Sequence, residues 1–162
     1  MNAKEAIRHT LQMSHDVLTT YLSDLSDAEI MIRPVPDANH IAWQMGHLVA
    51  SEHEMLTGAG FPAPPLPDGF AAAHTKETSS GDHTRGFLKK AQYLEAMEAQ
   101  RRATLAALDA ADEADLAKAA PEAMRPYAPT IGAVFNTIGL HELMHAGQFV
   151  GVRRKLKKPV LM

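Results

Sequence analysis

The sequence from residue 140 to residue 153 reads Leu140-His141-Glu142-Leu143-Met144-His145-Ala146-Gly147-Gln148-Phe149-Val150-Gly151-Val152-Arg153. Its two histidines, His141 and His145, are four residues apart in a segment that otherwise has the pattern of a buried helix. Residues four apart on a helix lie one turn above each other on the same face. We therefore expect both imidazoles to point in the same direction.

The helix that carries these histidines should begin after Thr130, which is a good N-cap, and run to about Lys155. Its inward positions recur every three or four residues, as on the core-facing side of a helix in a bundle. A buried imidazole without a partner costs about 1–3 kcal/mol. The two histidines are therefore expected to bind a metal ion or to be hydrogen-bonded to core carboxylates. The inward set is Ile131, Val134, Ile138, His141, His145, Phe149, Val152 and Leu156.

Three other long helices are predicted upstream, over residues 2–25, 41–57 and 87–110. Asn39 is expected to cap the second of them, and Gly58 and Gly60 should end it. Two short helices are also predicted. One follows the Ser26–Glu29 capping box, and the other begins near Asp112. The third long helix should bury Leu88, Ala91, Leu94, Met97, Leu105 and Leu108.

Basic residues are expected on solvated faces. Arg101 and Arg102 should face water on the third long helix and pair with Glu98. The cluster at the end of the last helix should complement the helix dipole and the exposed carbonyls there. That cluster is Arg153, Arg154, Lys155, Lys157 and Lys158.

Residues 58–83 form a connection rich in glycine and proline, which is long for a compact domain. The second long helix spans roughly 25 Å at about 1.5 Å per residue. A connection of this length can cross back over that distance, so the third long helix can run parallel to the second. An all-α bundle of four long helices, forming a single domain over residues 1–162, is the predicted architecture.

Composition excludes several classes of function. The formal charge of −3 gives no electrostatic reason to expect nucleic acid or an anionic membrane as a partner. No apolar run approaches the roughly 18 residues of a membrane span, and no signal peptide is recognised, so a cytoplasmic location is expected. The chain has nine histidines and no cysteine, so a transition-metal site must use imidazole and carboxylate.

We expect His47, on the second long helix, to complete a metal site with His141 and His145. Gly46 precedes it and permits the close approach of another group. Three imidazoles would leave coordination positions open, as in catalytic sites. His40 lies two turns away from His47 and His53 lies on another face, so neither is expected to be a ligand.

Five polar residues near these histidines are candidates for supporting roles, either orienting a ligand or moving a proton. Pointing Glu142 at the metal would need an unusual rotamer, because it lies about 100° round the helix from its neighbour His141. The spacing His-Glu-x-x-x-His also differs from the zinc-peptidase motif, so a peptidase is not expected. The candidates are Gln44, Gln148, Glu52, Glu54 and Glu142.

Two motifs together resemble the DinB-like (DinB/YfiT) family of metal-binding four-helix proteins. They are Trp43-x-x-Gly46-His47-Leu48 and His141-x-x-x-His145-Ala146-Gly147-Gln148. The resemblance covers nearly the whole chain and implies an up-down-down-up bundle, in agreement with the crossover. It also implies a divalent metal, usually zinc or nickel, held by His47, His141 and His145. Members of the family commonly form homodimers, and characterised relatives include metal-dependent transferases that use low-molecular-weight thiols.

Three functions remain open at the level of sequence. The first is an enzyme, such as a thiol S-transferase, in which the metal activates a small-molecule thiol or a water molecule. A metal-dependent hydrolase is compatible with the same residues. The third alternative is a non-catalytic bundle that binds a metal or small ligand, with the metal as a structural element. Because the ligands must be neutral imidazoles, metal affinity is expected to fall as the pH drops through about 6.5.

Overall fold

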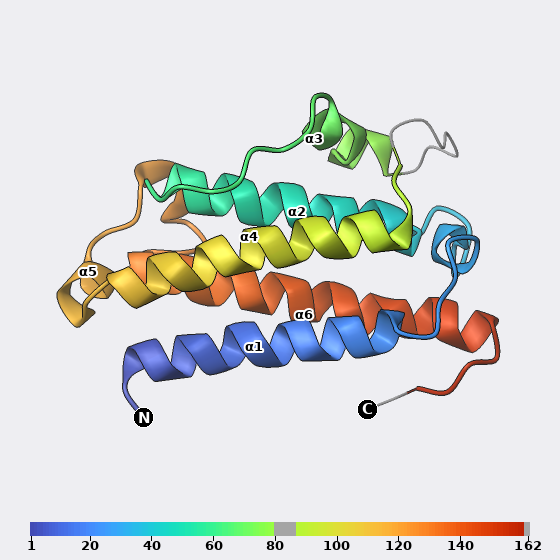
Figure 1. Cartoon of the computed structure of the whole chain (residues 1–162), viewed down its shortest axis with the longest axis horizontal. Helices are drawn as coiled ribbons and strands as arrows, with labels where there is room; N and C mark the ends of the chain where they lie inside the picture. Colours follow the sequence, from blue (N-terminus) through green and yellow to red (C-terminus); the bar gives the residue numbers. More distant parts are fainter. Residues whose placement is uncertain (80–86, 161–162) are drawn as a thin grey trace.

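A computed structural model describes residues 1–79 and 87–160 of the chain. Apart from one isolated β-bridge between Ala119 and Thr130, the regular secondary structure of the described residues is helical, and it contains four long helices, α1 (Ala3–Leu22), α2 (Ile41–Gly58), α4 (Lys90–Ala110) and α6 (Ile131–Lys155). Helix α2 is antiparallel to α1, α4 is parallel to α2, and α6 is parallel to α1 (Figure 1). The predicted all-α bundle is therefore confirmed, and its helices run up, down, down and up. None of the described helices is long and apolar enough to span a membrane.

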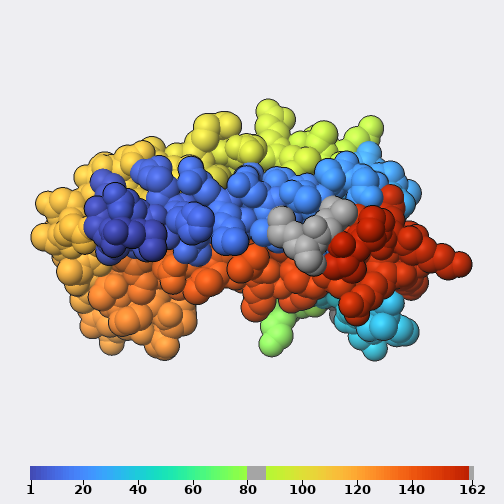
Figure 2. Space-filling model, turned by 90° about the horizontal axis from the view of Figure 1, so that it is seen from below, coloured from blue at the N-terminus to red at the C-terminus, as the bar shows by residue number. Residues whose placement is uncertain are grey.

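The helices pack in two main pairs, α1 with α6 and α2 with α4, and α2 also contacts α6. Figure 2 shows α1 and α6 lying side by side across one face of the molecule. Short elements lie in the connections. These are η1 (Glu29–Met31), α3 (Phe70–Ala73), η2 (Lys76–Thr78), α5 (Glu113–Ala117) and η3 (Glu122–Met124).

The helix ends follow local capping chemistry. Thr130 caps α6 as expected, since its side chain accepts from the amide of Ala133. The cap of α2 is His40, not the predicted Asn39, because His40 Nδ1 accepts from the amide of Trp43 at 2.9 Å. The α1 helix ends at Leu22 rather than at residue 25, and the amine of Lys90 binds the backbone carbonyl of Leu22.

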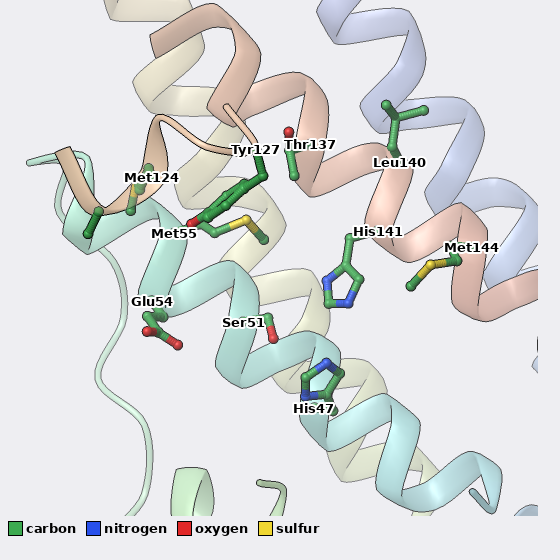
Figure 3. Close-up of a pocket in the computed structure, with 11 residues that line it drawn as sticks. His47, Ser51, Glu54, Met55, Met124, Tyr127, Thr137, Leu140, His141 and Met144 are labelled. Carbon is green, nitrogen blue, oxygen red and sulfur yellow. The ribbon is translucent and has the colours of Figure 1, made fainter. Parts of the chain in front are cut away.

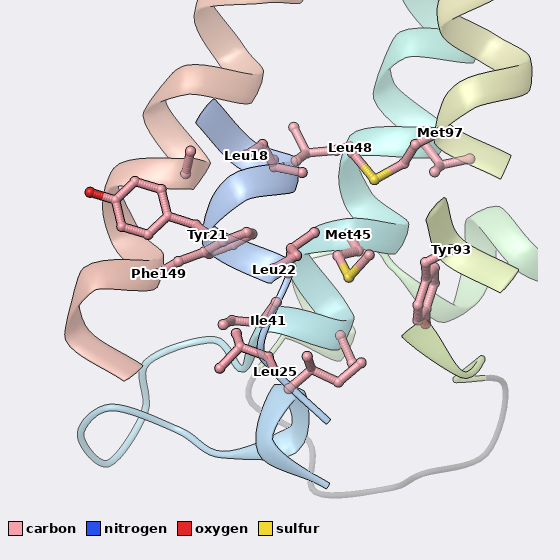
Figure 4. Close-up of a cluster of buried hydrophobic side chains, with 14 of the residues drawn as sticks. Leu18, Tyr21, Leu22, Leu25, Ile41, Met45, Leu48, Tyr93, Met97 and Phe149 are labelled. Carbon is pink, nitrogen blue, oxygen red and sulfur yellow. The ribbon is translucent and has the colours of Figure 1, made fainter. Parts of the chain in front are cut away.

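Two apolar clusters occupy the ends of the bundle. One lies toward η1, where α1 and α6 contribute Leu18, Leu22 and Phe149 (Figure 4). The other lies toward α5 and η3 and includes Leu56 and Phe135. Each fully buried aliphatic or aromatic side chain contributes about 1.5–3 kcal/mol. The level between the two clusters is polar, and it places buried Ser14, Glu52, Arg101, Thr104, Glu142 and His145 at the middle of the bundle.

The buried face of α4 differs from the prediction. The helix begins at Lys90 instead of at residue 87, and Ala91 is exposed. Arg101 is 4% exposed, so its predicted position on a solvated face is wrong. The buried face differs because Arg101 lies inside the bundle, where it pairs with Glu52 on α2 and Glu142 on α6. The buried set is Tyr93, Met97, Gln100, Arg101, Thr104, Ala107 and Leu108.

Arg153 also departs from the expected solvated cluster. Its side chain is fully buried and donates to the carbonyl of Tyr21 at 2.8 Å and to Asp24 Oδ1 at 2.6 Å. Hydrogen bonding to Arg153 holds the pKa of the Asp24 carboxyl below its usual value. Arg153 therefore joins α6 to the end of α1 and does more than complement a helix dipole.

Candidate metal centre

His47, His141 and His145 meet between α2 and α6, at the polar middle level of the bundle. One nitrogen of each ring lies within 4.8 Å of a nitrogen of the other two. His145 is buried, and the other two histidines are half-buried. No other group of three or more His, Asp or Glu side chains in the described part of the chain converges in this way. Residues almost a hundred positions apart thus form one cluster that can hold a metal ion.

Gln44 fixes the orientation of His145. Its amide nitrogen donates to the carbonyl of Asn39 at 3.1 Å, which directs its Oε1 at His145 Nδ1, 2.8 Å away. Nδ1 of His145 must therefore carry the proton, and the lone pair of Nε2 faces the cluster. That Nε2 lies 3.1 Å from His141 Nε2. Two nitrogens bound to one tetrahedral zinc ion are about 3.3 Å apart, so this spacing fits a shared metal.

The crossover between α2 and α4 fixes the orientation of His47. The backbone of His74, in the crossover, opposes the lowering of the pKa of His47 by burial. The ring of His47 also stacks on Trp43 at 4.8 Å between centroids, with 8° between the ring planes. The indole nitrogen of Trp43 in turn donates to the carbonyl of Thr75 and the hydroxyl of Thr78. The crossover therefore does more than connect two parallel helices, because it positions a proposed ligand.

Gly46 allows the crossover to come this close. A Cβ atom at Gly46 would lie 2.1 Å from the ring of His74, a distance that real side chains do not tolerate. The ring of His74 cannot move aside cheaply. Its Nδ1 donates to the carbonyl of Phe70 at 2.8 Å, and its Nε2 accepts from the hydroxyl of Tyr93 at 2.7 Å. The close approach expected at Gly46 is thus made by an imidazole of the crossover.

The three clustered histidines are neutral over a wide pH range. Burial, with the neighbouring imidazoles, lowers the pKa of His145 to about 3. Burial also lowers the pKa of His141 to about 4, and it lowers the pKa of His47. Neutral imidazoles with lone pairs directed at a common point are the donor set that a divalent transition metal requires. The residues present therefore fit such an ion.

A pocket of about 730 Å³ opens beside the cluster, between α2, α6 and the segment around η3. His47 and His141 form part of its wall, and Figure 3 shows their rings next to each other, one from α2 and one from α6. Most of the remaining wall is apolar. Its other members are Ser51, Glu54, Met55, Ala123, Met124, Tyr127, Thr137, Leu140 and Met144.

Comparison with known proteins identifies the family of the chain. The family model of the DinB superfamily matches residues 10–149, which include all three histidines. The chain belongs to the DinB superfamily. The match confirms the resemblance that the two histidine motifs indicated.

A solved structure shows that the fold is shared. The crystal structure of a conserved protein from Enterococcus faecalis superposes with a TM-score of 0.71, at 19% sequence identity, over 98% of this chain and 99% of that chain. At this identity the likeness is one of fold alone. No curated protein matches the chain.

The five predicted supporting residues of this DinB-superfamily chain lie in different surroundings, and only some of them are near the three histidines. Gln44 contacts His145, and Glu54 lines the pocket. Gln148 is exposed on α6, one turn beyond His145. Glu52 and Glu142 are buried but point away from the histidines, toward Arg101.

Arg101 was not recognised as part of this region from sequence, although it organises the polar level next to the histidines. Its guanidinium donates to Glu52 Oε1 at 3.1 Å and to Glu142 Oε2 at 2.8 Å. Glu142 also accepts from Ser14 and contacts His15. Burial alone would raise the pKa of Glu142, but His15 and Arg101 outweigh burial and hold that pKa below its usual value. Four helices of the DinB bundle are thus joined beside His141 and His145.

We expect Gln44→Leu to weaken metal binding about 10–100-fold, because loss of a hydrogen bond that orients a ligand has this effect at other metal sites. The substitution leaves the Nδ1 proton of His145 without its acceptor. Titration with zinc against a competing chelator measures the change. Gln148→Leu is the matched control on α6, and its affinity should equal that of the unmodified protein. Equal losses in the two variants would contradict the role assigned to Gln44.

The lowered pKa values also revise the expected pH dependence of metal binding. Protons compete for an imidazole only below its pKa, so the metal should stay bound well below pH 6.5 and be lost toward about pH 4. Without metal, the histidines of the unfolded chain bind protons below about pH 6.5. The same histidines do not bind protons there in the folded chain, because burial lowers their pKa values. The free energy of unfolding should therefore fall as the pH falls through this window. Equilibrium dialysis with elemental analysis measures occupancy, and half-loss near pH 6.5 would contradict burial of the ligands.

Proposed function

We propose that this chain is a divalent-metal-dependent enzyme that activates a small-molecule thiol or a water molecule at His47, His141 and His145. The observation that carries the proposal is the convergence of three protein donors, two of which line a pocket of about 730 Å³. Structural zinc sites usually have four protein ligands, whereas catalytic sites keep a position open. A large pocket at the open side of a three-histidine cluster supports a catalytic role.

When bound, a divalent ion would lower the pKa of a thiol or water molecule beside it, so that a nucleophile forms at neutral pH. The chain itself supplies orientation and a largely apolar wall. Gln44 holds one imidazole and Trp43 stacks on another, and the buried side chains of Met55 and Met124 form part of the pocket wall. Because the chain has no cysteine, any thiol must come from the substrate. These features support thiol transfer as the first form of the proposal.

We propose zinc or nickel as the metal. Imidazole donors suit both ions, and the absence of cysteine excludes a thiolate-rich site. Elemental analysis of protein purified without chelators tests this part of the proposal. About one equivalent of zinc or nickel per chain is expected, whereas a protein that acquires neither ion when both are supplied would overturn it.

A screen of thiols with electrophiles tests the activity. Protein loaded with zinc, protein loaded with nickel, chelator-treated protein and His141→Ala protein are compared for loss of free thiol and for hydrolysis of activated esters. Metal-dependent consumption of thiol, absent from the chelated protein and the variant, is the expected result. Ester hydrolysis without thiol consumption would identify the hydrolase alternative. Metal binding with neither reaction would favour a non-catalytic bundle.

A further inference from the structure

The polar side of the pocket is a row of three side chains on α2. His47, Ser51 and Glu54 lie at spacings of four and three residues, so they share one face of the helix. Figure 3 shows the row leading from the histidines to Glu54. Seven residues of helix correspond to about 10 Å along the axis. Glu54 therefore lies about 10 Å from the level of the proposed metal.

Among the lining residues of this pocket that the structure describes, Glu54 is the only one with a fixed charge. Among the described residues of its wall there is no lysine or arginine. Lys76 lines a neighbouring cavity that shares His47, Ser51 and Glu54, but neither His141 nor His145 borders that cavity. A carboxylate on a ligand in the larger pocket would thus meet a carboxylate and no cationic side chain. Like charges brought together in this way are unfavourable, whereas an ammonium group would be attracted.

The remaining wall favours an apolar body with a cationic end. Met55, Met124 and Met144 present flexible, polarizable side chains, and Leu140 adds an aliphatic surface. Tyr127 presents its ring to the same pocket, and the face of an aromatic ring attracts cations. Pockets with apolar walls and a few placed polar groups bind ligands that match both features.

We propose that this pocket selects an elongated, apolar substrate whose amine or other cationic group lies about 10 Å from its reacting end and is bound by Glu54. The inference rests on the proposed function, because the reacting end is placed beside the three histidines. Glu54 is thereby a specificity-determining residue. Substrates with a carboxylate at the same place are discriminated against.

Three biphenyl-4-thiols test the proposal, carrying an aminomethyl, a methyl or a carboxylate group at the far 4′ position. Their dissociation constants are measured by calorimetry with zinc-loaded protein, and with chelated protein as the reference. The amine should bind up to about fivefold more tightly than the carboxylate, since Glu54 is exposed and an exposed ion pair contributes up to about a factor of five. Glu54→Gln should reduce that preference to within about twofold, and Glu54→Lys should reverse it.

Glu95→Gln is the matched control, because Glu95 is an exposed glutamate on α4. It should keep the full preference for the amine. Equal binding of amine and carboxylate to the unmodified protein, or a preference that survives Glu54→Lys, would overturn the assignment of Glu54 while leaving thiol binding intact. Failure of all three thiols to bind the zinc-loaded protein would instead count against the proposed function on which the inference rests.

Discussion

Replacing His141 or His145 by alanine is expected to abolish stoichiometric metal binding. Loss of a residue that only orients a ligand lowers metal affinity about 10–100-fold, so loss of a ligand should exceed about 100-fold. The two nitrogens that converge at 3.1 Å would no longer form a pair. His47→Ala should have the same effect, because the other two donors lie on a single helix. Metal content after gel filtration, measured by elemental analysis, gives the result.

The control variants are His53→Ala and His9→Ala. His53 is on the same helix as His47 but outside the cluster, and His9 is exposed on α1. Both should retain the metal content of the unmodified protein. Circular dichroism should show unchanged helix content in every variant. Full metal content in any of the three cluster variants would remove that histidine from the site.

Arg101→Met is expected to destabilise the fold by about 3–5 kcal/mol, because it leaves buried carboxylates without their cation. Glu52 and Glu142 both accept from this guanidinium. Burial raises the pKa of Glu52, and the charge of Arg101 opposes that rise. Methionine keeps most of the side-chain length, so the loss reports on charge more than on volume. Urea unfolding followed by circular dichroism measures the change.

Arg102→Met is the matched control, since Arg102 is the exposed neighbour of Arg101 on the same helix. Its effect should lie within about 0.5 kcal/mol of zero. Adding Glu52→Gln and Glu142→Gln to Arg101→Met should recover part of the lost stability, because no buried charge then lacks its partner. Equal stability of the two arginine variants would mean that the buried ion pairs do not hold the middle of the bundle.

The helices could be predicted from the sequence because their signals are local. The cap at Thr130 and the end near Lys155 follow from side-chain chemistry and hydrophobic period, and both match α6. The cap of α2 was assigned to Asn39 because an imidazole acceptor such as His40 is a rarer cap. The parallel course of α2 and α4 also followed from sequence, since the long crossover gave the chain enough length to return.

The polar level could not be predicted because it depends on partners from other helices. Arg101 looks like a surface residue until Glu52 and Glu142 are placed opposite it. One signal was available. Tyr93, Met97, Arg101, Thr104 and Leu108 recur at spacings of four and three, which placed an arginine on a core stripe.

His74 gave no comparable signal before the structure was known. It follows a four-residue helix inside the crossover, where neither period nor capping points to a role. Its contacts with Gly46 and Tyr93 come only from the tertiary arrangement. The three clustered histidines were more accessible to prediction, because two of them occupy core positions of a strongly periodic helix.

The central claim is that His47, His141 and His145 bind one divalent metal and leave room for a substrate. Anomalous diffraction from a crystal of zinc-loaded protein, collected on both sides of the zinc absorption edge, tests it most directly. The account predicts one strong peak about 2.0–2.1 Å from a nitrogen of each histidine, with no fourth protein ligand. A peak elsewhere in the molecule, or a fourth protein side chain closing the site, would contradict it.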